Sequence, residues 1–299
     1  AIDAFKDTLN YWRDWISKST YIGRWREVVH RSALVLKILT SSRFGSIVAS
    51  PTFGLPEDIG GVRNWDYRYT WIRDSSFTLY ALMRLGYTEE AHAFMHWLEK
   101  RCEESDTSYG GLQLMYGIDG RHQLTEVELD HLEGYMNSKP VRIGNGAYDQ
   151  TQLDIYGEMM DSVYLYDRYG GSINYDLWKS LTKMLNWLTE NWHTPDHGIW
   201  EIRGGEKEFL FTRVMNWVAL DRGIRLARKR SLPAPLDKWI KARDVIYEDV
   251  FENFWNDELQ AFVQSKGSDV MDASCLVMPL VRFIGPQDPK WLSTLRAVE

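Results

Sequence analysis

A cluster of charged and aromatic residues precedes one of the predicted buried helices. Residues 63–75 read RNWDYRYTWIRDS, and nine of the thirteen are charged or aromatic. An Arg–Asp pair such as Arg73 and Asp74 can donate to and accept from neighbouring hydroxyl groups of a sugar. Trp71 would supply an apolar wall beside them. In the alternative interpretation Asp74 is a helix N-cap and Arg73 its ion-pair partner, an arrangement that needs no ligand.

A second candidate is a carboxyl group directly after a tryptophan, in the segment 197–205, HGIWEIRGG. Glu201 follows Trp200 in a predicted loop between helices. If the indole desolvates the carboxyl group, the pKa of Glu201 rises, so that it holds a proton near neutrality. A general acid needs that proton for a leaving oxygen. In the alternative, Glu201 is an exposed loop residue paired with Arg203.

The polar segment 142–150, RIGNGAYDQ, precedes another predicted helix. Its amide and carboxyl side chains could bind hydroxyl groups, but Asn-Gly is also typical of turns. We interpret Asp149 as a helix cap, and leave Asn145 open between the two roles. His92 and His96 have a metal-compatible spacing, yet their amphipathic helix favours surface histidines. The acidic stretch 126–133 is interpreted as a solvated loop rather than a cation site. We expect no metal.

Composition limits the class of protein. The 299 residues contain 35 Lys and Arg and 42 Asp and Glu, and the resulting net charge of −7 argues against a nucleic-acid partner. No apolar run has membrane-spanning length, and no signal peptide is evident. Two cysteines are too few for a disulfide framework, so we expect a cytoplasmic location. The 14 Trp and 16 Tyr fit either a Trp-rich helical core or a carbohydrate site.

Helical periodicity dominates the chain and predicts an all-α fold. Apolar helices with few charges alternate with amphipathic, charged ones, as an inner and an outer ring of helices would require. The segment 74–85 resembles 272–283 at several offsets, which supports a repeated helix pair. Short strands are expected near 45–50, 112–116 and 261–264, and long loops near 41–65, 105–147 and 193–211. The predicted helices span 5–16, 28–39, 77–85, 89–100, 149–169, 176–192, 212–230, 236–251 and 272–283.

The sequence resembles the glycoside hydrolase family that holds glucoamylases, glucodextranases and bacterial-type trehalases. The most specific piece is WDYRYTWIRD at 65–74, and the other pieces are 47–57, 60–85, 112–141, 152–166 and 198–226. The resemblance implies an (α/α)6 toroid and hydrolysis of α-glucosidic bonds from the non-reducing end with inversion. It implies that no cofactor is needed.

The same resemblance implies the roles of the site residues. Glu201 matches the general acid of the family. Arg73 and Asp74 match the pair that holds the terminal glucose, and Trp71 matches an aromatic residue of the site. The predicted substrate contacts are completed by Tyr69, Asn145 and Trp200.

The chain also departs from the family pattern. An inverting glycosidase needs a second carboxyl group as general base, and no stretch after Glu201 resembles the segment that carries it. The predicted helix pairs fall short of six, and the N-terminal β-domain of bacterial members is missing. Because the chain starts with Ala1 inside a predicted helix and ends with Glu299 in mid-pattern, we interpret 1–299 as one truncated catalytic domain.

Three alternatives remain open at this stage. An α,α-trehalase would use the same chemistry on trehalose instead of a maltooligosaccharide. A non-catalytic carbohydrate-binding or scaffold protein would explain the absent base. An α-solenoid interaction module is disfavoured by the long loops and the cluster at 71–74. The sequence leaves the oligomeric state open.

Overall fold

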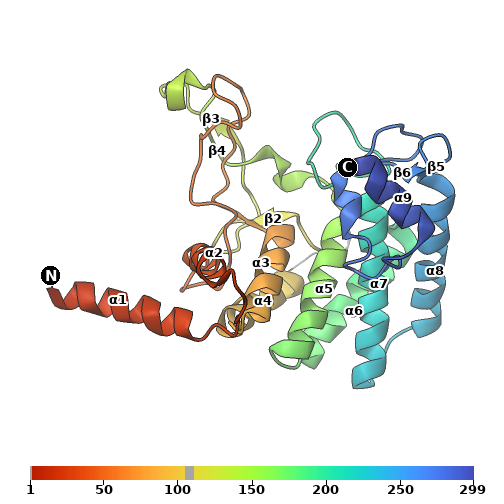
Figure 1. Cartoon of the computed structure of the whole chain (residues 1–299), viewed down its shortest axis with the longest axis horizontal. Coiled ribbons are helices and arrows are strands. Elements are labelled where there is room, and N and C mark those ends of the chain that lie inside the picture. Colours follow the sequence, from red (N-terminus) through yellow and green to blue (C-terminus); the bar gives the residue numbers. More distant parts are fainter. Residues whose placement is uncertain (1, 105–110) are drawn as a thin grey trace. The chain divides into compact units, whose positions relative to one another are not determined.

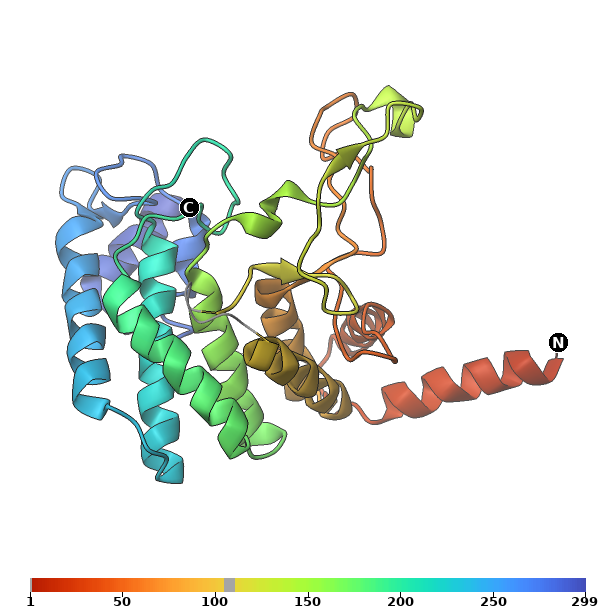
Figure 2. The same cartoon turned by 180° about the vertical axis from the view of Figure 1, so that it is seen from behind.

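A computed structural model describes residues 2–104 and 111–299, which are mostly helical (Figures 1 and 2). The chain forms two compact units. The first unit comprises Ala1–Arg101, Met115–Tyr148 and Leu165–Ile173, and the second comprises Cys102–Leu114, Asp149–Tyr164 and Asn174–Glu299. Among the described helices, none combines the length and the hydropathy that a membrane span requires.

The helices are α1 (Ile2–Ser17), α2 (Arg26–Ile38), α3 (Ile72–Arg84), α4 (Glu89–Glu104), α5 (Asp154–Tyr169), α6 (Tyr175–Asn191), α7 (Leu210–Arg230), α8 (Leu236–Asn253) and α9 (Pro289–Val298). Short 3-10 helices are η2 (Tyr135–Asn137), η3 (Gly146–Asp149) and η4 (Ala273–Val277). The strands are β1 (Thr70–Trp71), β2 (Met115–Tyr116), β3 (Val127–Glu128), β4 (Arg142–Ile143), β5 (Trp255–Asn256) and β6 (Ala261–Phe262). They form three antiparallel two-stranded pairs, β1–β2, β3–β4 and β5–β6.

The core of the first unit forms where α1, α2 and α3 meet. Trp15 stacks on Tyr87 with ring centroids 4.0 Å apart, and both pack with Ala33 and Leu82. The Trp15 indole N–H donates to Glu90 at 2.8 Å, so the buried polar edge of the ring is satisfied. This cluster fixes α3, which begins directly after β1.

Helix α7 is the central helix of the second unit. It contacts both α6 and α8, and 17 of its 21 residues are buried. Helix α8 instead buries one stripe, Trp239, Ala242, Ile246 and Val250. A helix that is buried all round must be surrounded by protein, whereas an amphipathic helix covers it from outside. The predicted alternation of the two helix types is therefore confirmed in this unit.

The structure corrects three expectations. The segment 272–283 is not an α-helix: it forms η4 and then turns, because Pro279 cannot donate a helical hydrogen bond and its ring clashes with the preceding turn. The helix expected from Asp149 begins at Asp154, and Asp149 ends η3. Helix α3 is not buried all round, because Phe77 and Tyr80 are exposed on the face away from Leu79 and Leu82.

The strand expectations had mixed outcomes. The segment 45–50 forms a single bridge, between Thr40 and Ile47. The segment 112–116 contains β2, which pairs with β1, and the segment 261–264 contains β6, which pairs locally with β5. The first six residues of the expected loop 105–147 lie outside the described residues.

Candidate active site

The junction between β1 and α3 presents three of the predicted site residues. Trp71 is the N-cap residue of α3 with extended backbone, and its side chain makes no capping hydrogen bond. Asp74 is the third residue of the helix, so the interpretation of Asp74 as an N-cap is wrong. Trp71 and Arg73 are buried, while Asp74 reaches solvent. Protein nevertheless surrounds Asp74 closely enough that desolvation raises its pKa, against the opposing charge of Arg73.

Tyr69 and Asn145 lie in the same unit and are bonded to its backbone. The Tyr69 hydroxyl accepts from the Gly144 N–H at 3.1 Å. The Asn145 Oδ1 accepts from the Ala147 N–H at 3.0 Å, and its amide donates to the Asp66 carbonyl at 3.4 Å. Both side chains therefore stabilise the turn between β4 and η3. A role in substrate contact stays a prediction for each.

The Asp66 carboxylate also stabilises the turn between β4 and η3. Its carboxylate accepts from Arg68 at 2.8 and 2.9 Å and from the Gly144 N–H at 3.2 Å. Burial opposes its ionisation, but the hydrogen bonds from Arg68 outweigh burial and hold the pKa of Asp66 below its ordinary value. The turn is thus built on a charged carboxylate at neutral pH.

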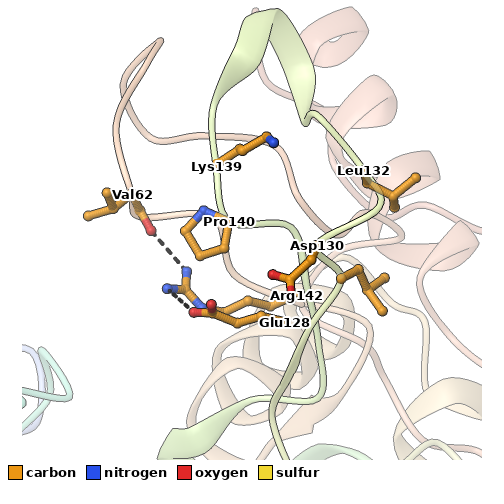
Figure 3. Close-up of a pocket in the computed structure, with 8 residues that line it drawn as sticks. Val62, Glu128, Asp130, Leu132, Lys139, Pro140 and Arg142 are labelled. Atoms are coloured by element: carbon orange, nitrogen blue, oxygen red, sulfur yellow. Dashed lines mark hydrogen bonds and ion pairs between the residues drawn. The ribbon is translucent and has the colours of Figure 1, made fainter.

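A cavity of about 330 Å³ lies beside β3 and β4 of the first unit (Figure 3). Arg142 is its central charged group and donates to the Val62 carbonyl at 2.9 Å and to Glu128 at 3.1 Å. It also pairs with Glu126 at 3.3 Å. Glu126 and Glu128 are therefore ion-paired with Arg142, while Glu128, Asp130 and Glu133 are exposed, in agreement with the solvated loop expected at 126–133.

The two histidines with metal-compatible spacing have other partners. The ring of His92 contacts the Tyr166 hydroxyl at 2.5 Å, and His96 lies 3.8 Å from Glu99. Among residues 2–104 and 111–299, no three His, Cys, Asp or Glu side chains are grouped so that they could hold a metal ion.

Glu201 lies in the second unit, on a tight turn of the loop between α6 and α7. The Glu201 N–H donates to the Gly198 carbonyl at 3.1 Å, which closes the turn, and the Ile202 N–H donates to the His197 carbonyl at 3.1 Å. Glu201 has a φ of 52°, a left-handed conformation that is unfavourable for a residue with a side chain. The surroundings must therefore hold this turn in place.

A hydrogen bond from the indole N–H fixes the side chain of Trp200. Its indole N–H donates to Asp272 Oδ2 at 2.6 Å, and the side chain is 60% exposed. Asp272 also accepts from Gln264 at 3.2 Å and from the Ser274 N–H at 3.0 Å, so η4 and the segment after β6 fix the position of this carboxylate. The indole ring is thereby anchored at one edge and open to solvent over most of its surface, as a platform for a ligand would be.

Asp196 is a buried carboxylate beneath the Glu201 turn that sequence reasoning missed. Its oxygens accept from the Leu153 N–H at 2.9 Å, the Thr212 hydroxyl at 2.9 Å and the Gly198 N–H at 3.1 Å. Burial, together with the nearby carboxylate of Asp154, raises the pKa of Asp196 from 3.8 to about 7. The signal available in the sequence was Asp-His-Gly, a turn pattern with no indication of burial.

The raised pKa of Asp196 predicts a specific pH dependence of stability. The folded state binds this proton more tightly than the unfolded state, so the stabilisation is complete below about pH 4 and is lost as pH rises through about 7. Asp196→Asn removes the titration. Between about pH 4 and pH 7, the free energy of unfolding of the parent should fall relative to that of the variant by about 3 kcal/mol. Urea unfolding of both proteins across this range measures the difference, and a constant difference would contradict the prediction.

The predicted site residues thus fall into two groups. Tyr69, Trp71, Arg73, Asp74 and Asn145 lie in the first unit, and Trp200 and Glu201 lie in the second. In the second unit the structure adds polar residues around the Glu201 turn. Gln150 donates to the Glu201 carbonyl at 3.5 Å and accepts from Gln152 at 3.0 Å.

Comparison with known proteins places this chain in a family. Residues 23–299 match glycosyl hydrolases family 15. The chain is 40% identical to a trehalase of Thermoplasma acidophilum and 41% identical to a trehalase of Mycobacterium tuberculosis, over 98% and 100% of its length. It spans about half the length of these curated relatives, 50% and 44% respectively.

Solved structures agree on the fold. A bacterial glucoamylase complexed with acarbose superimposes with a TM-score of 0.74 at 15% identity, over 100% of this chain and 43% of the other. A glucoamylase of Saccharomycopsis fibuligera gives a TM-score of 0.62 at 16% identity, over 90% and 57%. The expected fold class, that of the glucoamylase (α/α)6 proteins, is confirmed. The match over residues 23–299 shows that the chain belongs to glycosyl hydrolases family 15.

Proposed function

We propose that the protein hydrolyses a terminal α-glucosidic bond, with trehalose as its preferred substrate. The observation that carries this proposal is the identity of about 40% to curated trehalases over 98–100% of the chain. Glucoamylase-like hydrolysis of maltooligosaccharides is the second candidate, because a bacterial glucoamylase shares the fold at a TM-score of 0.74. Both reactions release glucose and differ in the group that leaves.

Glu201 is the general acid in this proposal. Its place in a short turn closed by the hydrogen bond to Gly198 limits the positions that its carboxyl group can reach. The exposed indole of Trp200 lies next to it in sequence and is fixed by Asp272. A carboxyl group that protonates a leaving oxygen must be placed within hydrogen-bond reach of that oxygen, and a rigid turn serves this purpose.

Arg73 and Asp74 hold the terminal glucose in this proposal, with Trp71 as the apolar wall. Arg73 and Asp74 bring a donor and an acceptor to the first turn of α3, and binding to sugar hydroxyls uses both. Asn145 acts from the turn between β4 and η3, Tyr69 acts from its position before β1 with its hydroxyl bonded to that turn, and Trp200 supplies a second aromatic surface. We further propose that residues 1–299 belong to one catalytic domain and that the protein works without a cofactor.

We propose that the reaction inverts the configuration at the attacked carbon. Inversion needs a second carboxyl group about 6.5–9.5 Å from the first, with a water between them. Asp272, which contacts the Glu201 loop through Trp200, already accepts three hydrogen bonds, so we do not assign it this role. We assign the general base to no residue of 1–299.

The test compares two disaccharides with the protein expressed from its complete open reading frame. We expect kcat/KM for trehalose to exceed that for maltose by at least about tenfold, since a built site discriminates strongly against a misplaced hydroxyl. Proton NMR in the first minutes should show α- and β-glucose in equal amounts from trehalose, because inversion converts only one of the two rings. A purely α product would indicate retention. Glucose release from maltose alone would favour the second candidate, and binding without hydrolysis would support a carbohydrate-binding protein.

A further inference from the structure

The buried carboxylate of Asp196 bonds directly to the turn that carries Glu201. Glu201 lies in a left-handed conformation with a φ of 52°, and Gly198 at the start of the turn has a φ of 64°. Within the turn, the hydrogen bond from the Glu201 N–H uses the Gly198 carbonyl. The N–H of Gly198 donates to Asp196 Oδ1 at 3.1 Å. Movement of Gly198 therefore moves the residue that closes the turn on Glu201.

The same carboxylate is fixed to two helices. Its other oxygen, Oδ2, accepts from the Leu153 N–H just before α5 and from the Thr212 hydroxyl in the first turn of α7. The backbone of Asp196 pairs with Lys207 in both directions, at 2.8 and 2.9 Å, which closes the loop 196–207 at its base. One oxygen thus contacts the helical framework and the other contacts the turn.

We infer that Asp196 is a positioning residue for Glu201, which transmits the position of α5 and α7 to the turn that presents the acid. This inference rests on the proposed function of Glu201. Burial next to Asp154 makes the charged carboxylate of Asp196 unfavourable, as its raised pKa shows. An ionisable residue at this position therefore lowers the stability of the folded state and calls for another explanation. Its geometric use is that two oxygens can accept from three donors on three different segments.

Replacing Asp196 by asparagine distinguishes the bonds to the helical framework from the bond to the turn. One amide oxygen can still accept from Leu153 and Thr212, which places the NH2 group opposite the Gly198 N–H. Two donors then face each other, and the turn loses the bond by which Asp196 connects Gly198 to the helices. Asp196→Asn should therefore release the turn while it leaves the framework bonds in place. Thr212→Val is the matched control, because it removes one framework bond from the same carboxylate and keeps the bond to Gly198.

The experiment is done on the complete protein with two substrates. Their leaving groups differ in whether they must be protonated to depart. Trehalose has a sugar leaving group that must be protonated, whereas fluoride leaves α-glucosyl fluoride without a proton. Asp196→Asn should lower kcat for trehalose by about 30-fold or more with little change in KM, and lower kcat for the fluoride by less than about threefold. Thr212→Val should lower both by less than about threefold. Circular dichroism and thermal unfolding confirm that equal amounts of folded protein are compared.

The outcomes separate this inference from the proposed function. Glu201→Gln, run beside it, should show the same selective loss on trehalose. If Glu201→Gln shows the selective loss but Asp196→Asn slows the two substrates equally or slows neither, Asp196 has only a structural role. The inference about Asp196 is then overturned, while the proposed role of Glu201 stands. If Glu201→Gln hydrolyses trehalose at the parent rate, both claims fail.

A second variant covers the case in which Asp196→Asn does not fold. Gly198→Ala moves the same turn from the other side, because an added Cβ would lie 2.7 Å from the Phe209 ring at a φ of 64°. The selective loss on trehalose should recur in Gly198→Ala, and equal losses on both substrates would overturn the inference.

Discussion

Glu201→Gln should lower kcat for the preferred α-glucoside by about a thousandfold and leave sugar binding nearly unchanged. Glutamine has the size of glutamic acid but no proton to give, so only the step that protonates the leaving oxygen is lost. Steady-state kinetics of the complete protein give kcat, and calorimetric titration of the variant with substrate gives the affinity. Hydrolysis by Glu201→Gln at a rate near that of the parent would remove Glu201 from the mechanism.

Glu206→Gln is the matched control for this result. Glu206 is a carboxylate of the same loop, half exposed, and its partner His197 lies 3.9 Å away. An exposed pair at this distance contributes little, so kcat should stay within about twofold of the parent. A large loss in Glu206→Gln would mean that the loop as a whole responds to lost charge, and the effect at Glu201 could not then be assigned to proton transfer.

The largest stability effect is expected at Gly157 in α5. A Cβ at this position would lie 2.2 Å from the carbonyl oxygen and 2.7 Å from the carbonyl carbon of Met215, so α5 and α7 touch backbone to backbone here. Backbone atoms of a buried helix cannot turn aside as a side chain can. Gly157→Ala should therefore lower the free energy of unfolding by about 3 kcal/mol, although alanine has the better helix propensity. Urea unfolding of both proteins measures the difference.

Gly223→Ala in α7 separates this steric effect from a general effect of helix glycines. An added Cβ would lie 2.4 Å from Leu185 Cδ1, the end of a flexible side chain, with the Trp239 ring 3.3 Å away. Leu185 can change rotamer, and the gain in helix propensity offsets part of the crowding. The free energy of unfolding should change by less than about 1 kcal/mol. Equal losses in the two variants would contradict the close approach at Gly157.

The helices of the second unit could be predicted because their signal is local. Helix α7 is buried on all sides over most of its length, and α8 repeats Trp239, Ile246 and Val250 on one stripe, as the predicted inner and outer types require. The segment 272–283 was mispredicted because its apolar residues also fit a helix, while Pro279 prevents one. The exposure of Phe77 in α3 depends on which elements cover that face, which a single segment does not encode.

The candidate site was predictable only where residue type alone carries the chemistry. Trp71, Arg73, Asp74 and Glu201 stand out by type and order. Asp196 does not, because its significance arises from bonds to residues 43 and 16 positions away. The bonds of Tyr69 and Asn145 to the turn between β4 and η3 were also not readable from sequence, since Gly144 lies 75 residues after Tyr69.

The bond between Trp200 and Asp272 has a consequence for the order of events during synthesis. The two residues are 72 positions apart, and α7, α8, β5 and β6 lie between them. A nascent chain can complete much of α7 while its indole at position 200 still rotates freely. The indole becomes oriented only after the ribosome has released residue 272 and η4 has formed, so the position of Trp200 depends on a contact that forms well after residue 200 itself has been synthesised.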